Sequence, residues 1–158
     1  MFRSILVAVD GSEPATEALH EAIDLARGEG ARLTLISVAA PPRWLGSPGP
    51  FIAPVPLEEA LERRAHEVVE EAEALVPEDV PVSTVVRRGS AAKAILERVE
   101  AGQHDVVVMG SRGLGSAGSL LLGSVSRAVL AHSRVPVLIA RAHVGSAGTR
   151  EAREATAA

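Results

Sequence analysis

The sequence predicts an α/β fold in which helices cover both faces of a parallel sheet. Short apolar runs rich in Val, Ile and Leu alternate along the chain with segments of helical periodicity. The runs are continuously apolar, as is typical of strands buried on both faces. Only 2% of the residues are aromatic, so we expect an aliphatic core. This order predicts three layers, α/β/α, around one five-stranded parallel sheet, with strands at 5–9, 32–38, 82–87, 105–109 and 135–140.

The first strand is followed by a turn signal and a helix. The run 5–9 stops at Asp10-Gly-Ser12, which combines a turn with a helix N-cap residue. Apolar residues then recur at i, i+3, i+4 and i+7 over 15–26, which predicts one buried helix face. Glycines at 28 and 30 are expected to end this helix.

The middle of the chain contains a proline-rich segment between its predicted strands and helices. Residues 39–56 include six prolines, so we expect little regular structure there. Loops of this length are either functional or mobile. The apolar stripe over 57–75 predicts a second helix, and a third is predicted to begin at Ser90 and run through Val99.

The last third repeats the strand–helix–strand order around a glycine-rich stretch. That stretch runs from 110 to 123, between the fourth strand and a helix predicted over 124–132. From residue 143 the chain has no periodicity. We therefore expect one domain over residues 1–142 and a disordered tail over 143–158.

Composition excludes several classes of function. The chain has 16 Lys and Arg against 20 Asp and Glu, a net charge of −4, which argues against a protein that binds nucleic acid or a membrane surface through cations. There is no cysteine, so disulfides and thiolate sites are excluded. No apolar run is long enough for a signal peptide or a membrane span, so we expect a soluble cytoplasmic protein. The histidines lack metal-ligand spacing, and His104 is expected at the surface.

The glycine-rich stretch lies where such folds bind ligands. In open parallel sheets, ligands bind beyond the carboxyl ends of the strands, where the winding direction reverses, and Asp10, Val38 and Gly110 are predicted to lie at such ends. Glycines permit positive φ and let a ligand approach the bare backbone. The helix beginning at Ser124 offers free N–H groups and the positive end of its dipole. A phosphate group, above all one on a nucleotide, suits this combination.

Two common phosphate motifs do not account for this stretch. The Walker pattern requires Gly-Lys-Ser/Thr, and residues 110–130 contain no lysine. A dinucleotide pattern, Gly-x-Gly-x-x-Gly, occurs at 113–118, but it follows the fourth strand, and no Asp or Glu lies between Gly118 and Arg150 to hold a ribose hydroxyl. The pattern that remains is Gly110, two residues, Gly113, nine residues, then Gly123-Ser124.

This pattern, Gly-x2-Gly-x9-Gly-Ser after an Asp-Val-Val-Val-Met strand, resembles the ATP-binding branch of the universal stress protein family. The opening Ile5-Leu-Val-Ala-Val-Asp-Gly-Ser12 and the closing Val135-Pro-Val-Leu-Ile139 resemble it too, so the likeness spans nearly all of 1–141. The resemblance implies a fold like that of the adenine nucleotide alpha hydrolases, with strand order 3-2-1-4-5. It also implies a homodimer formed through the last strand, 135–140.

The resemblance further implies which residues bind ATP, ADP or AMP. Asp10 would lie beside the ribose or base, the Val38 backbone would hold adenine, and Met109 would pack near both. The glycines after the fourth strand would pass the α- and β-phosphates. Apart from the resemblance, the residues themselves leave Arg112 as either a phosphate contact or a surface charge. Amides at the start of the next helix would hold the outer phosphates, often with Mg²⁺. The full set is Asp10, Val38, Met109, Gly110, Arg112, Gly113, Gly123, Ser124, Val125 and Ser126.

The chain departs from the family at two positions beside the phosphates. Many relatives carry Arg or Lys directly after the second glycine and shortly before the third, where this chain has Leu114 and Ser119. Less positive charge is therefore expected to face the phosphates, with Arg112 and Arg127 as the candidates to compensate.

Four functions remain open from the sequence. The first is a nucleotide-binding regulatory protein of the stress response. The second, a slow ATPase, would need a positioned base, and Asp10 is the carboxylate we place near the site, on its ribose side, so no catalytic residue is predicted. The third is a dimeric adaptor without nucleotide. A flavodoxin-like electron carrier shares the layer order, but its phosphate loop would follow the first strand.

Overall fold

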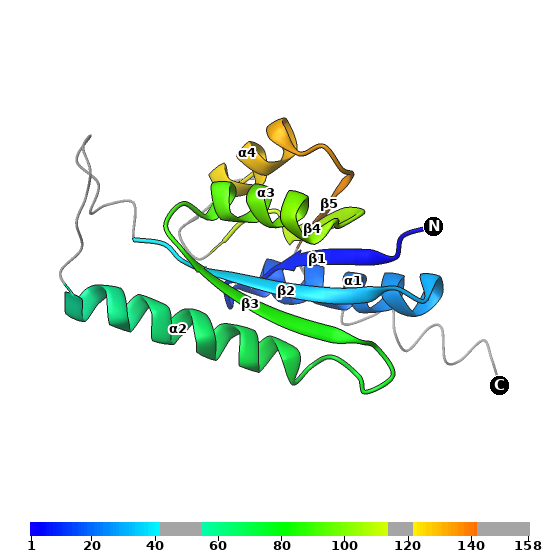
Figure 1. The fold of residues 1–158 in the computed structure, drawn as a ribbon, viewed down its shortest axis with the longest axis horizontal. Helices are drawn as coiled ribbons and strands as arrows, with labels where there is room; N and C mark the ends of the chain where they lie inside the picture. Colours follow the sequence, from blue (N-terminus) through cyan, green and yellow to red (C-terminus); the bar gives the residue numbers. More distant parts are fainter. Residues whose placement is uncertain (42–54, 114–121, 142–158) are drawn as a thin grey trace, which may run out of the picture.

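In the computed structural model, which describes residues 1–41, 55–113 and 122–141, a parallel sheet lies between two helical layers (Figure 1). Five strands run in the order β3-β2-β1-β4-β5, with every neighbouring pair parallel, which confirms the predicted fold class and strand order. The elements are β1 (Ser4–Ala8), α1 (Glu13–Glu29), β2 (Arg32–Ala39), α2 (Val55–Glu73), β3 (Val82–Arg88), α3 (Ala91–Gly102), β4 (Val106–Gly110), α4 (Ser124–His132) and β5 (Val137–Ala140).

Proline sets two of the boundaries that differ from prediction. Helix α2 begins at Val55 and takes Pro56 into its first turn, where a missing N–H costs nothing. Strand β5 begins at Val137 and not at 135, because Pro136 lacks the N–H of a ladder hydrogen bond, although its carbonyl accepts one from the Val107 amide at 3.0 Å. The predicted tail, 143–158, and most of the proline-rich segment lie outside the described residues.

Each face of the sheet buries its own aliphatic cluster. On the α1 and α2 side, Val7 and Val108 pack with Leu19 and Val68. On the α3 and α4 side, Leu6 and Val107 pack with helix residues that include Ile95 and Val129. Successive strand residues point to opposite faces, which explains why continuously apolar runs were required. Within the described residues, no helix combines the length and apolar character needed to cross a bilayer.

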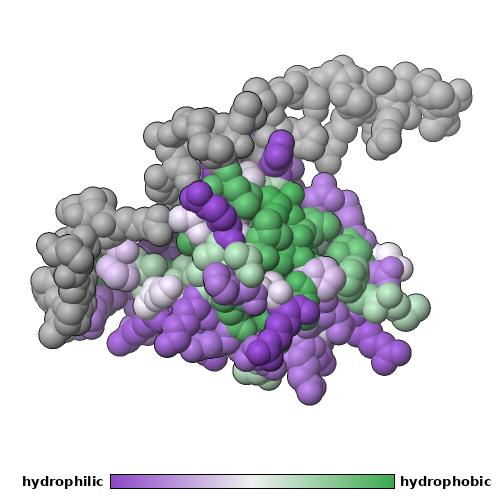
Figure 2. Space-filling model, turned by 90° about the horizontal axis from the view of Figure 1, so that it is seen from above, coloured by the Kyte–Doolittle hydropathy of each residue, from purple (hydrophilic) through white to green (hydrophobic). Residues whose placement is uncertain are grey.

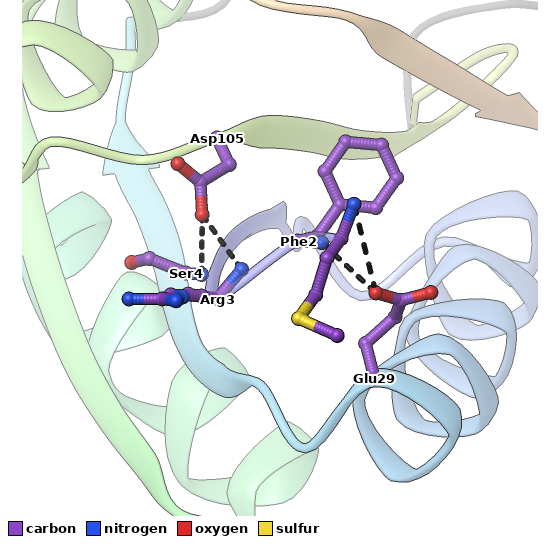
Figure 3. Close-up of polar contacts among 6 residues, drawn as sticks. Phe2, Arg3, Ser4, Glu29 and Asp105 are labelled. Atoms are coloured by element: carbon purple, nitrogen blue, oxygen red, sulfur yellow. Dashed lines mark hydrogen bonds and ion pairs between the residues drawn. The ribbon is translucent and has the colours of Figure 1, made fainter.

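The amino-terminal edge of the sheet is tied by two carboxylates (Figure 3). Asp105 Oδ2 accepts hydrogen bonds from the Arg3 amide at 2.7 Å and the Ser4 amide at 2.9 Å. These backbone hydrogen bonds lower the pKa of Asp105 below its usual value. Glu29, at the end of α1, accepts from the Phe2 amide at 3.1 Å. The start of β1 is thereby joined to β4 and α1.

His104 is buried beside this edge, so its predicted surface position was wrong. Only 4% of the residue is exposed, and Ser4 Oγ lies 2.9 Å from its Nδ1. Gln103, with φ of 50°, takes the left-handed conformation that ends α3 and turns the chain inward. Burial, then the charges of Arg98 and Arg32, lower the pKa of His104 to about 4, against the smaller opposing effect of Asp105.

Candidate functional site

The strand order places a reversal of winding between β1 and β4. These strands are neighbours, with Ala8 opposite Met109, but α1 follows β1 on one face of the sheet and α4 follows β4 on the other. The chain segments leaving the two strands therefore diverge at the carboxyl edge, which is where open α/β sheets bind ligands. Asp10 leaves one strand at this point and residues 111–113 leave the other.

The turn after β1 holds the Asp10 carboxylate in place. Asp10 Oδ1 accepts hydrogen bonds from the Ser12 amide at 3.0 Å and from Ser12 Oγ at 2.5 Å. Gly11 between them has a φ of 80°, a backbone conformation that residues with a Cβ rarely adopt. Ser12 occupies the predicted N-cap position of α1, but its side chain makes no cap hydrogen bond because it donates to Asp10. Sequence reasoning missed this orienting role of Ser12.

The second glycine of the motif touches this carboxylate. A Cβ placed on Gly113 would overlap Asp10 Oδ2, so the Gly113 backbone approaches the carboxylate more closely than any other residue type would allow. The fold therefore brings together two predicted site residues that are 103 positions apart in sequence.

The other two motif glycines are also sites of close approach. A Cβ on Gly110 would lie 2.7–2.9 Å from backbone atoms of Pro14 and Ala15, and one on Gly123 would lie 3.3 Å from Arg112 Cα. Neither Gly110, Gly113 nor Gly123 has a positive φ; among the described glycines that conformation occurs at 11, 30 and 89. Close packing, and not the expected backbone freedom, is therefore why glycine occupies these three positions. Contact of Gly110 with the first turn of α1 had no signal in the sequence.

Short hydrogen bonds fix both ends of the glycine-rich stretch. The Ser111 amide donates to the Ala140 carbonyl at 2.7 Å, and the Gly123 amide donates to the Ser111 carbonyl at 2.7 Å. Ser126 is 3% exposed, and its Oγ donates to the Gly110 carbonyl at 2.8 Å. The Ser126 hydroxyl therefore anchors the stretch, while Leu114 and Ser119 lie outside the described residues.

The first turn of α4 presents open backbone donors. Its N-cap residue, Gly123, has no capping side chain, and no acidic residue occupies the first turn. Among the described residues, no acceptor forms a hydrogen bond with the backbone amide of Ser124 or Val125. Such amides, together with the helix dipole, favour an anion.

Three predicted site residues share one apolar cluster near these polar groups. Met109 is 4% exposed, and the half-buried Val38 and Val125 pack against the cluster it belongs to. The Val38 carbonyl accepts a hydrogen bond from the Ala40 amide at 2.9 Å. Arg112 is half-buried, and its backbone lies against Gly123. All ten predicted residues thus lie along the carboxyl edge or at the start of α4. Within the described residues, no group of three His, Cys, Asp or Glu side chains could hold a metal ion.

Comparison with known proteins places this fold in a family. The model of the universal stress protein family matches residues 1–141. The Thermus aquaticus "universal stress protein in QAH/OAS sulfhydrylase 3'region" is 40% identical over 144 residues, covering 89% of this chain and all of that protein. Two solved structures share the fold: an Archaeoglobus fulgidus universal stress protein in complex with dAMP (TM-score 0.65, 19% identity, 87% and 97% coverage) and an Arabidopsis thaliana family member with AMP bound (TM-score 0.63, 18% identity, 90% and 93% coverage). The chain therefore belongs to the universal stress protein family.

Proposed function

We propose that this chain binds an adenine nucleotide at the switch point between β1 and β4 and acts as a regulatory protein of the stress response. The observation that carries the proposal is the contact between the Asp10 carboxylate and Gly113. Next to Gly113, the backbone of Arg112 packs against Gly123, and Gly123 directly precedes the open amides of α4. A carboxylate that can accept from ribose hydroxyls and amides that can donate to phosphates therefore lie on contiguous segments. The AMP and dAMP complexes of relatives support this choice of ligand.

The proposed contacts follow the polarity of the site. Asp10 takes the ribose, the apolar edge with Val38 and Met109 takes the base, and Gly113 with Arg112 lies along the first phosphates. Backbone amides of 123–126 take the outer phosphates. Mg²⁺ usually keeps several waters and binds through substrate phosphates, so we expect any Mg²⁺ at this site to be carried by the phosphates.

Energetics require these parts to act together. A single charge–dipole contact contributes only about 0.3–1 kcal/mol, whereas micromolar affinity corresponds to about 8 kcal/mol. Several amides, the Asp10 carboxylate and burial of the base must therefore combine. ATP, ADP and AMP share these elements and differ in the number of phosphates that the start of α4 must hold.

Nucleotide binding is expected to raise the melting temperature. A ligand at 100 times its dissociation constant stabilises the folded state by about 2.7 kcal/mol, which for a domain of this size is a rise of roughly 5–11 °C. Differential scanning fluorimetry with ATP, ADP and AMP, each with and without Mg²⁺, measures the shift, with GTP and inorganic phosphate as controls. If no adenine nucleotide shifts the melting temperature and none is released from freshly purified protein on denaturation, the proposal is wrong, and the nucleotide-free adaptor takes its place.

We also propose that the protein forms a homodimer through β5. This strand is an edge of the sheet, paired only with β4 among the described strands, and its Leu138 is 40% exposed. On the α3 and α4 side of the molecule, apolar side chains form a continuous area bordered by hydrophilic ones (Figure 2). On that side Leu130 of α4 is 51% exposed, and Val137 and Ile139 of β5 are half-buried. Open edges and apolar areas of this kind are typical of protein interfaces.

Substitution of Leu138 by Asp is expected to convert the dimer to a monomer, because each protomer would then place a negative charge on the paired edge strand, close to the same charge of its partner. Sedimentation velocity measures the change. The control is Leu75→Asp, which alters an equally apolar, 51% exposed leucine that follows α2, away from β5. A wild-type monomer, or a dimer that survives Leu138→Asp, would contradict the proposed interface.

A further inference from the structure

Helix α2 packs close to the turn that carries Asp10. A Cβ on Gly11 would lie 3.2 Å from Arg64 Nη2 and 3.3 Å from Val68 Cγ2. Gly11 is therefore a glycine for two reasons, its positive φ and the closeness of these two side chains. Arg64 and Val68 are one helical turn apart, so a single face of α2 meets the turn.

The guanidinium of Arg64, half exposed to solvent, forms ion pairs on its other side. Arg64 Nη1 donates to Glu67 Oε2 and to Glu71 Oε1, each at 3.2 Å. The planar fork thus has one nitrogen held by carboxylates of its own helix while the other reaches the turn. Lysine has a single nitrogen and could not make both sets of contacts with the same rigidity.

The space between this turn, α1 and α2 is not completely filled by side chains. A hollow of about 110 Å³ lies between α1 and α2 beside the turn, with Gly11, Thr16 and Val68 among its lining residues. Close-packed neighbours resist displacement, and this hollow leaves room for the turn to move toward α2. On the α2 side, the atoms nearest to where a Gly11 Cβ would lie belong to Arg64 and Val68.

We propose that Arg64 is a positioning residue for the nucleotide site: its guanidinium, anchored by Glu67 and Glu71, braces the Asp10–Gly11–Ser12 turn against α2 and so sets where the Asp10 carboxylate lies. The inference rests on the proposed function, since Asp10 is taken as a nucleotide contact. Ser12 and Gly113 hold the carboxylate from its other sides. Loss of the brace would let the turn move into the hollow and carry Asp10 away from Gly113. By linkage, nucleotide binding would in turn hold α2 in place.

The test compares Arg64→Met with Arg63→Met, which removes the neighbouring exposed arginine. Isothermal titration with AMP is expected to show a dissociation constant raised roughly 3- to 30-fold for Arg64→Met and unchanged for Arg63→Met. The melting temperature without nucleotide should stay within a few degrees of wild type, because exposed ion pairs contribute little to stability. Glu71→Gln, which keeps the size of the side chain, is expected to give a smaller loss of affinity in the same direction.

Hydrogen exchange separates positioning from a general structural effect. In the wild type, AMP is expected to slow exchange in the part of α2 around residues 64–72, and in Arg64→Met this protection should disappear even at saturating AMP. Equal affinity of the Arg64→Met and Arg63→Met proteins, with wild-type binding intact, would overturn the positioning role and leave the proposed function standing. Absence of AMP, ADP and ATP binding in the wild type itself would instead refute the proposed function, and the positioning role with it.

Discussion

Alanine at Gly110 is expected to destabilise the fold, whereas alanine at Gly113 is expected to weaken nucleotide binding and leave the fold intact. The two glycines belong to one motif but have different neighbours. A Cβ at 110 would lie 2.7–2.9 Å from backbone atoms at the start of α1, which cannot move without displacing the helix. Overpacking of this kind costs about 1–3 kcal/mol.

The neighbour of Gly113 is a side chain and not backbone. A methyl group there would push the Asp10 carboxylate aside by a χ rotation, which weakens its hydrogen bonds from Ser12 but leaves the backbone in place. Displacing the carboxylate would remove a charged hydrogen bond to the nucleotide, a loss of about 1.5–3 kcal/mol, or roughly 10- to 150-fold in affinity.

Urea unfolding and AMP titration of the two variants measure these effects separately. Gly28→Ala is the matched control, because a Cβ there would meet nothing within 4 Å and the residue is helical. That variant should bind AMP like the wild type and be at least as stable. A Gly113→Ala protein with unchanged affinity would show that Asp10 does not contact the nucleotide.

Mild acid is expected to destabilise the protein through His104. The pKa of His104 is about 4 in the folded chain and near 6.5 when exposed, so the unfolded chain binds more protons between these values. Stability from neutral His104 is therefore fully present above about pH 6.5 and is lost as the pH falls toward 4. The loss amounts to about 2 kcal/mol between pH 7 and pH 5.

The structure gives the physical reason for this loss. The Nδ1 of His104 lies within hydrogen-bond distance of Ser4 Oγ, and its Nε2 has no hydrogen-bond partner among the described residues. The charges of Arg98 and Arg32 disfavour a positive charge on the His104 ring. Protonation would place a positive charge in a buried ring, and the Nε2–H would have no hydrogen-bond acceptor among the described residues. Asp105 acts in a lower window: because its folded pKa is depressed, its stabilisation is lost only as the pH falls below about 4.

Urea unfolding at pH 7 and pH 5 measures the contribution of His104. In His104→Gln the difference in stability between the two pH values should shrink by about 2 kcal/mol relative to wild type. His20→Gln, which alters an exposed histidine of α1, should leave the difference unchanged. An unaltered pH dependence in His104→Gln would mean that the buried ring is not the group that titrates.

The sequence by itself determined the elements and their order. Strand β4, helix α4 and the turn at Asp10 were predictable because apolar runs, helical periodicity and turn residues act between neighbours along the chain. The strand order, and the ten residues expected at the site, came from the likeness of three segments to a known family. Prediction went wrong at His104, because one left-handed residue before it decided between surface and core.

Only the tertiary structure decided why the motif contains glycine at each position and what holds the site in place. Gly110 against Pro14, Gly113 against Asp10 and Gly11 against Arg64 are contacts between segments about 50 to 100 residues apart. No local pattern encodes such pairs, because each depends on how strands and helices pack after they form. Helical periodicity assigns Arg64 to α2 one turn before a buried valine, yet only packing brings its guanidinium beneath the turn that carries Asp10.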